Sequence, residues 1–315
     1  MTNFLWATCQ TGFEAWLKNE VALRHPGLRS AYSRPGFLTF KSETPVAPEF
    51  DLRCAFARSF ACSLGKLTVP SEHDPAFLEK LDELAKRHHA EIAQPLSEPQ
   101  KGQRVLCHTI ARESDAGKEC WFGLHTHDPA VHRPWLDGIP SHIALPPEAP
   151  SRTFLKMEEG LQWSRLALRA GDAALELGSA PGGASLALLN RGLRVSGVDP
   201  ADMADSIKTS PHFRHIRKQS TQLTKTELES LGSRYWIFSD MNIDPRSALK
   251  SILSCRAKAP ALGGLFMLKL TDSIALEDMD SILQKLRAAG FGEVSMAQLY
   301  FNRAELCVAF GPRAL

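Results

Sequence analysis

Hydrophobic and polar positions follow two different periods along the second half of the chain. Short apolar runs typical of buried strands are separated by stretches whose apolar residues have helical spacing. The expected strands are Ala173–Leu177, Leu193–Val198, Phe213–Ile216, Tyr235–Ser239, Leu262–Leu270, Val294–Phe301 and Glu305–Phe310. The expected helices are Ser151–Arg169 (capped by Ser151), Ala184–Asn190, Pro245–Cys255 and Ile274–Ala289. This alternation predicts an α/β fold with a doubly wound, mainly parallel sheet that closes with an antiparallel last strand.

In the first half of the chain, strand-like apolar runs and helically spaced apolar residues do not alternate regularly. Strands are expected at Phe4–Cys9, Gly36–Phe40, Arg104–Ile110 and Cys120–His125, helices at Phe13–Leu23 and Asp74–His89, and a helix followed by a strand over Phe56–Leu67. This mixture predicts an α+β unit of ferredoxin-like type. The pairs His88-His89 and His125-x-His127 have no partner cluster in the sequence, so we interpret them as solvated surface side chains and expect no metal.

A proline-rich stretch over residues 139–151 separates the two halves. We therefore expect one domain over residues 1–145 and a second over residues 146–315. Residues 1–150 hold 16 basic and 18 acidic side chains, a net −2, whereas residues 151–315 hold 21 and 17, a net +4. The basic excess lies in the second half.

Composition narrows the class of protein. Of 315 residues, 43% are apolar and 23% charged, which excludes a disordered chain, and the formal net charge of +2 argues against a wholly basic nucleic-acid binder. No apolar stretch of about 18 residues and no signal-peptide pattern is present, so no membrane partner is expected. The seven cysteines are widely spaced without a CxxC pair, which indicates buried thiols in a reducing compartment, the cytoplasm.

The strongest local motif is Glu176-Leu177-Gly178-Ser179-Ala180-Pro181-Gly182-Gly183, which follows a strand and precedes a helix. Glycines there allow the backbone to approach a ligand, and ligands in such sheets bind beyond the carboxyl ends of the strands. No lysine follows the glycines, so a nucleoside triphosphate loop is not indicated. Asp199 ends the next strand, where an acidic side chain suits a ribose diol.

With its flanks, this run resembles the S-adenosylmethionine motif of the FtsJ-type RNA ribose methyltransferases, which have a Rossmann-like fold. The family's Lys-Asp-Lys-Glu tetrad matches Lys156, Asp240, Lys269 and Glu305, in the family's order and at the expected element ends. The resemblance implies S-adenosyl-L-methionine as the cofactor. The implied binding residues are Glu176, Gly178, Ser179, Ala180, Pro181, Gly182, Gly183, Asp199, Gln219 and Asp240.

Further segments are similar to the bacterial RlmM-type enzymes of this superfamily. They are Pro134-Trp135-Leu136-Asp137-Gly138-Ile139-Pro140, Pro150-Ser151-Arg152, Gln298-Leu299-Tyr300 to Val308 and, less densely, Cys9-Gln10-Thr11-Gly12-Phe13-Glu14. The resemblance implies 2′-O-methylation of a cytidine in 23S ribosomal RNA, before full assembly of the large subunit, and a THUMP-like RNA-binding domain over residues 1–145. The sequence departs from the family at Gln219, where an acidic residue near the adenine is usual and an amide would have to replace it.

The tetrad suggests how a ribose hydroxyl would be activated. A base must receive its proton, and a lysine can do so only if a neighbouring ammonium and burial lower its pKa. We therefore expect Lys269 to be the base and Lys156 its cationic neighbour, with Asp240 and Glu305 orienting both. Phosphate contacts are expected from Arg214, Arg217, Lys218, Arg246, Lys250, Arg256 and Lys258.

Two alternatives stay open. The same chemistry could act on transfer RNA, or the chain could be a non-catalytic RNA-binding factor in ribosome assembly, for which Gln219 is the only support. The sequence does not distinguish a monomer from a homodimer.

Overall fold

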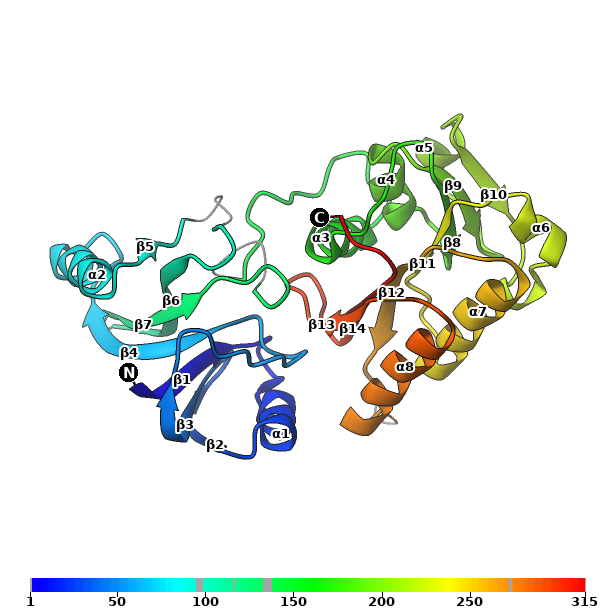
Figure 1. Cartoon of the computed structure of the whole chain (residues 1–315). Helices are drawn as coiled ribbons and strands as arrows, with labels where there is room; N and C mark the ends of the chain where they lie inside the picture. The colour runs from blue at the N-terminus through cyan, green and yellow to red at the C-terminus, as the bar shows by residue number, and fades with distance from the viewer. Residues whose placement is uncertain (1, 95–98, 116, 133–137, 272–273, 315) are drawn as a thin grey trace. The chain divides into compact units, whose positions relative to one another are not determined.

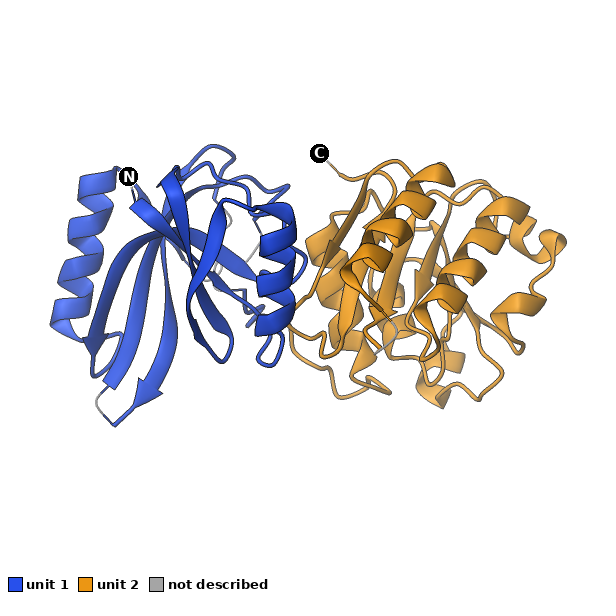
Figure 2. Cartoon of the chain, turned by 90° about the horizontal axis from the view of Figure 1, so that it is seen from below, with its two compact units in different colours: residues 1–142 blue, residues 143–315 orange. Residues whose placement is uncertain are grey.

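Two seven-stranded sheets organise the computed structural model, which describes residues 2–94, 99–115, 117–132, 138–271 and 274–314. The chain divides into two compact units, residues 1–142 and 143–315, coloured separately in Figure 2. The boundary therefore lies three residues before the expected end of the first domain at residue 145. Among the described residues, no helix combines the length and apolarity that crossing a bilayer requires.

The second unit is a doubly wound α/β sheet. Its strands are β8 (Ala173–Leu177), β9 (Arg194–Val198), β10 (Phe213–Ile216), β11 (Tyr235–Ser239), β12 (Gly264–Lys269), β13 (Val294–Ala297) and β14 (Glu305–Phe310). Its helices are α3 (Thr153–Ser164), α4 (Gly183–Asn190), α5 (Asp205–Lys208), α6 (Lys225–Glu229), α7 (Pro245–Lys258) and α8 (Leu276–Ala288), with a short 3₁₀ turn η1 (Ser220–Gln222). The strand order is β10-β9-β8-β11-β12-β14-β13, and β14 runs antiparallel to both of its neighbours. This confirms the predicted Rossmann-like α/β class.

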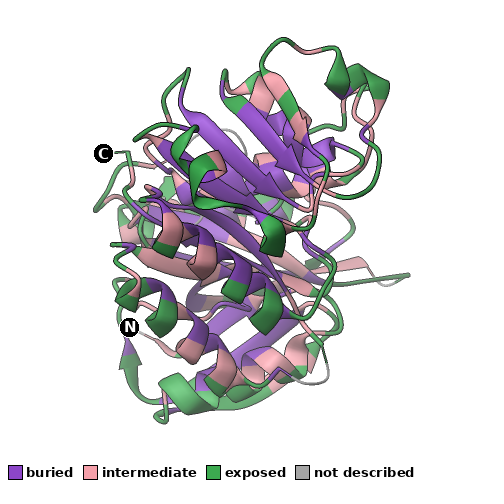
Figure 3. Cartoon of the chain, turned by 90° about the vertical axis from the view of Figure 1, so that its right-hand side faces the viewer, coloured by how far each residue is buried: buried purple, intermediate pink, exposed green. Residues whose placement is uncertain are grey.

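Helices cover both faces of this sheet, with α3 and α4 on one side and α7 and α8 on the other (Figure 1). The central strands β8, β11 and β12 are almost wholly buried, as expected for parallel strands between two helical layers (Figure 3). Side chains of α3 and α4 share a core with Trp236 and Phe238 of β11. Gly160 allows α3 to approach the sheet, since a Cβ there would lie 3.1 Å from Cys307 Sγ and 3.2 Å from Leu265 Cδ1.

The first unit is an α+β unit with a mostly antiparallel sheet. Its strands are β1 (Thr2–Thr8), β2 (Leu28–Arg34), β3 (Phe37–Val46), β4 (Ser59–Val69), β5 (Glu91–Ile92), β6 (Arg104–Ser114) and β7 (Gly117–Thr126), and its helices are α1 (Glu14–Arg24) and α2 (Pro75–His88). The strand order is β2-β3-β1-β4-β7-β6-β5, and only β5 and β6 pair in parallel. No helix lies between β3 and β4, where a complete βαββαβ unit would have one. The ferredoxin-like and THUMP-like assignment stays a prediction.

Several elements differ from the sequence-based expectation. The helix expected over Ser151–Arg169 ends at Ser164, because Arg165 adopts a left-handed conformation with φ of 50° and the chain then pairs Leu166 with Arg313. Ser151 does not cap this helix, whose N-cap is Arg152.

Three further differences concern strands. Residues 56–58 form no helix, and β4 takes up the rest of that segment. The strand β2 was not predicted because most of its residues are exposed and leave no alternating apolar pattern. The strand expected over Val294–Phe301 ends at Ala297. Six of the seven cysteines are buried, as predicted, and none forms a disulfide among the described residues.

Candidate functional site

The four tetrad side chains come from elements that end at one edge of the second sheet. Asp240 directly follows β11, and Lys269 is the last residue of β12. Glu305 begins β14 and pairs with Lys269, because β14 runs antiparallel to β12 and therefore starts where β12 ends. Lys156 lies in the first turn of α3, which packs on this sheet.

These four residues form a closed network of ion pairs. Lys156 Nζ lies 2.6 Å from Asp240 Oδ2 and 3.2 Å from Glu305 Oε1. Lys269 Nζ lies 2.5 Å from Asp240 Oδ1 and 3.2 Å from the same Glu305 oxygen. Each ammonium therefore contacts both carboxylates, and the charges alternate around the cluster with a net charge of zero. The structure thus brings together the four residues that the tetrad motif predicted.

Burial makes these charges interact strongly. The exposed fraction of each side chain is 16% or less, and that of Asp240 is 5%. Burial by itself lowers the pKa of Lys156, but the Asp240 and Glu305 carboxylates outweigh it and raise that pKa above its ordinary value. Burial likewise raises the pKa of Glu305, and Lys156 and Lys269 outweigh it, so the net pKa is lowered.

For Lys156, the nearby carboxylates of Asp240 and Glu305 therefore decide the direction of the pKa. The lowered lysine pKa expected from the sequence concerned Lys269, the expected base, and stays a prediction. Lys156 is therefore held protonated, as a cationic neighbour of Lys269 must be. It is suited to holding the two carboxylates in place.

Sequence reasoning missed the role of Glu159, a residue of α3. Its side chain is fully buried, and its carboxylate accepts hydrogen bonds from the backbone N–H groups of Tyr300 (2.7 Å) and Phe301 (2.8 Å). These residues lie in the turn that leads into β14 and Glu305. Glu159 thereby fastens α3, which carries Lys156, to the segment that carries Glu305. The signal available in the sequence was the position of Glu159, a carboxylate on the apolar face of an amphipathic helix.

The glycine-rich turn after β8 is closely packed against its own surroundings. Gly178 has φ of 79°, and a Cβ there would lie 2.6 Å from Met241 Cγ. Gly182 has φ of 117°, and a Cβ would lie 2.6 Å from Ile207 Cγ1. Both positions therefore require glycine for conformation and for space. The turn leads directly into α4, which begins at Gly183.

Asp199 follows β9, the strand beside β8, and faces this turn. Its Oδ2 accepts a hydrogen bond from the backbone N–H of Ala180 (3.1 Å) and its Oδ1 one from Ala201 (2.8 Å). Carboxylate oxygens can accept more than one bond each, so this fixed side chain retains capacity for hydroxyl donors. The Asp199 carboxylate, held beside the glycine-rich turn, therefore fits a ligand whose ribose hydroxyl groups donate hydrogen bonds.

Two predicted cofactor residues have different surroundings. Glu176 lies inside β8, where burial raises its pKa to about 8 despite a 2.5 Å hydrogen bond from Ser185 Oγ. It is therefore placed to support the turn from within the sheet. Gln219 is exposed just after β10, and its backbone N–H donates to Gln222 Oε1. The segment Pro134–Asp137 lies outside the described residues.

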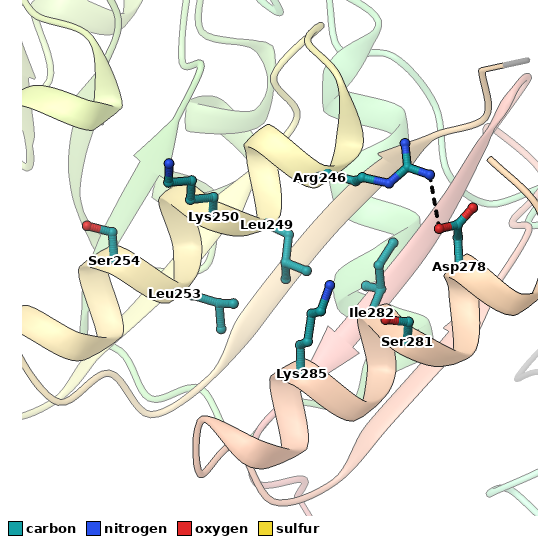
Figure 4. A pocket seen from close by; sticks show the side chains of 9 residues that line it. All are labelled: Arg246, Leu249, Lys250, Leu253, Ser254, Asp278, Ser281, Ile282 and Lys285. Carbon is teal, nitrogen blue, oxygen red and sulfur yellow. Dashed lines mark hydrogen bonds and ion pairs between the residues drawn. The ribbon is translucent and has the colours of Figure 1, made fainter. Parts of the chain in front are cut away.

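Most of the basic residues expected to contact phosphate are engaged within the fold. Arg217 pairs with Asp202, Lys218 with Glu227 and Arg246 with Asp278, whereas Arg256 and Lys258 donate to backbone carbonyls. Arg214 and Lys250 are exposed and pair with no carboxylate among the described residues. Lys250 lines a pocket between α7 and α8 with Arg246 and Lys285, and Asp278 is its one acidic side chain (Figure 4). Among the described residues, Arg214, and Lys250 in this pocket, are therefore the expected phosphate contacts that are engaged with neither a carboxylate nor a backbone carbonyl.

Comparisons with known proteins give a consistent result. No family model matches the chain. The protein named Ribosomal RNA large subunit methyltransferase M from Alkalilimnicola ehrlichii is 33% identical over 198 residues, which are 58% of this chain and 51% of that protein. As in this case, the chain spans about half the length of the curated relatives it matches first. The protein of the same name from Aromatoleum aromaticum is 29% identical over 349 residues, 96% of this chain and 93% of that protein.

Solved structures resemble the chain only remotely. The 23S rRNA methyltransferase ErmE shares 10% identity and a TM-score of 0.37, over 53% of this chain and 70% of that one, which is too distant to carry an argument. The sequence relatives nevertheless confirm the resemblance inferred from the motifs. This chain is a homologue of the proteins named Ribosomal RNA large subunit methyltransferase M.

Proposed function

We propose that the chain is an S-adenosylmethionine-dependent RNA methyltransferase of the cytoplasm that acts on the 2′-hydroxyl of a cytidine in 23S ribosomal RNA. The observation that carries the proposal is the closed network of Lys156, Asp240, Lys269 and Glu305 at the carboxyl edge of the sheet. Burying charged groups of alternating sign costs desolvation energy, and such a network adds little stability compared with apolar side chains in the same place. The presence of the network therefore favours a chemical role. The homologues named as large-subunit ribosomal RNA methyltransferases support the choice of substrate.

The residues at the strand ends would hold the methyl donor. Asp199 would accept hydrogen bonds from its ribose, and the turn over residues 178–183 would form the wall beside it. Gln219 follows β10, the neighbour of β9, and Asp240 follows β11, the neighbour of β8. When bound, S-adenosylmethionine supplies a sulfonium-activated methyl group, so the protein needs only to position the acceptor and remove a proton.

The tetrad would perform that second task. Lys269, at the end of β12, first releases one proton from its Nζ atom to solvent, and the neutral amine then accepts the proton of the ribose hydroxyl. Lys156 stays protonated, because the two carboxylates raise its pKa, and it remains ion-paired with Asp240 and Glu305. The two carboxylates fix the direction of the Lys269 side chain through the 2.5 Å and 3.2 Å contacts.

Two measurements test this function. Calorimetric titration of the full chain with S-adenosylmethionine should show binding to one site, whereas the reading as a non-catalytic assembly factor expects none. Mapping of ribose methylation in ribosomal and transfer RNA, from cells with and without the protein, should reveal one cytidine of 23S RNA that loses its 2′-O-methyl group. An unchanged 23S pattern would overturn the proposal, and a loss confined to transfer RNA would move the substrate to that class.

A further inference from the structure

The first unit contains a cluster of three histidines that the methyl-transfer site does not use. His125 lies in β7, His127 follows two residues later, and His132 lies beyond a short turn. His125 is 4% exposed and His127 1% exposed, and His132 is half-buried. Burial overturns the expectation that the first two are solvated surface side chains.

Local backbone geometry explains why the three rings meet. Residues two apart on an extended segment point to the same side, which places His125 and His127 together. The chain then turns back, because the N–H groups of Val131 and His132 both donate to the Asp128 carbonyl at 2.9 and 2.7 Å. The His132 ring stacks on that of His125 with centroids 4.1 Å apart, and it lies 5.5 Å from the ring of His127.

The cluster leaves buried ring nitrogens in need of partners. Within the part of the chain that the structure describes, His125 Nε2 and His132 Nε2 are buried and accept or donate no hydrogen bond. A buried polar atom without a partner costs about 1–3 kcal/mol. The other nitrogen of each ring has a polar neighbour. His132 Nδ1 accepts a hydrogen bond from the Asp128 backbone N–H at 3.0 Å and lies 3.3 Å from the Asp128 carbonyl oxygen, and His125 Nδ1 lies 3.7 Å from Cys107 Sγ. These contacts fix the orientation of the two rings.

One ligand nitrogen from each of the three rings lies within 4.8 Å of the others. A tetrahedral ion with metal–nitrogen distances of about 2.0–2.1 Å would hold them roughly 3.4 Å apart, which small rotations of the rings can reach.

We propose that His125, His127 and His132 form a binding site for one zinc-class divalent transition-metal ion, with three imidazole ligands. No carboxylate belongs to the cluster, so the donor set favours zinc-class ions over magnesium or calcium, which prefer oxygen ligands. The ion would attach the segment after β7 to the sheet. This inference concerns the first unit and does not depend on the proposed methyl transfer.

Metal titration of the full chain, first stripped with a chelator and kept reduced, tests the site. We expect one equivalent of zinc by calorimetry, visible d–d absorption with cobalt(II), and a melting temperature that rises with zinc but not with magnesium. His132→Gln, a half-buried position, should weaken zinc binding at least 100-fold, whereas His73→Gln, an exposed position in the same unit, should not change it.

Two results would overturn the proposal. Folded wild-type chain that binds no stoichiometric zinc and shows no zinc-dependent melting shift would mean that the histidines only pack together. Zinc binding that is equally strong in His132→Gln would place the ion on other groups, such as the cysteine thiols. The melting shift of the wild-type chain keeps the test valid even if the variant is poorly folded.

Discussion

Lys156 and Lys269 donate hydrogen bonds to the same oxygen, Glu305 Oε1, each over 3.2 Å, although one lysine lies in a helix and the other ends a strand. Glu305 therefore contacts two ammonium groups at once, and Asp240 does the same. Removal of either carboxylate leaves the two ammonium groups to share one negative charge.

This relationship predicts a pH-dependent contribution to stability. Because Lys156 and Lys269 lower the pKa of Glu305 below its unfolded value of 4.5, its stabilising effect is present above pH 4.5 and is lost as the pH falls through the folded pKa. The free energy of unfolding of the wild type should exceed that of Glu305→Gln at pH 7, and the difference should shrink on acidification. Urea unfolding at several pH values measures it. Glu277→Gln, an exposed position in α8, serves as control, and a difference that grows in acid would refute the argument.

A second prediction concerns the anchor of the β14 turn. Glu159→Gln places an amide group against the N–H groups of Tyr300 and Phe301 and leaves one of them without an acceptor. We expect a loss of about 1–3 kcal/mol in the free energy of unfolding. Methyl transfer should also fall, with unchanged cofactor affinity, because Glu305 moves. The matched control is Glu158→Gln, whose side chain bonds Gln162 and Arg191 instead. Equal losses of methyl transfer in both variants would show that Glu159 has no positioning role.

The sequence predicted the second unit far better than the first. The α/β alternation was readable because β8 and β11 are short, mainly apolar runs between polar turns. The ends of β8, β10 and β11 match the expected residues. In the first unit, β2 carries no such signal, since it is an exposed edge strand. The ends of elements set by backbone conformation, such as the left-handed turn at Arg165, were also beyond a reading of periodicity.

The site shows the same division. The tetrad residues were predicted from motif order, which places them at element ends. The direction of the Lys156 pKa was not predictable, because it depends on distances to Asp240 and Glu305 that only the fold sets. The burial of His125 and His127 also required the fold, since histidine occurs both at surfaces and in cores.

A third prediction follows from the buried carboxyl group of Glu176. Because burial raises its pKa to about 8, the folded protein keeps it protonated while the unfolded chain ionises above pH 4.5. Its effect on stability is therefore favourable below pH 4.5 and is lost as the pH rises to about 8. The stability of the wild type relative to Glu176→Gln should fall when unfolding is measured at pH 4.5, 6 and 9. A constant difference would contradict the raised pKa.

A fourth prediction concerns the pocket between α7 and α8. If Lys250 and Lys285 contact phosphates, their joint replacement by alanine should weaken binding to 23S RNA. The slope of log affinity against log salt concentration should then decrease by about 1 for each lysine removed. Lys225→Ala, on the exposed surface of α6, should leave the slope unchanged. An unaltered slope in the double variant would place the RNA elsewhere.

The central claim is that the tetrad transfers a methyl group to a ribose hydroxyl, with Lys269 as the base. The most direct measurement incubates the full chain with methyl-labelled S-adenosylmethionine and large-subunit RNA from cells lacking the protein, and then identifies the labelled nucleoside by mass spectrometry. We predict label in 2′-O-methylcytidine with the wild type and essentially none with Lys269→Ala, which still binds the cofactor. Label on a base, or undiminished transfer by Lys269→Ala, would contradict the account.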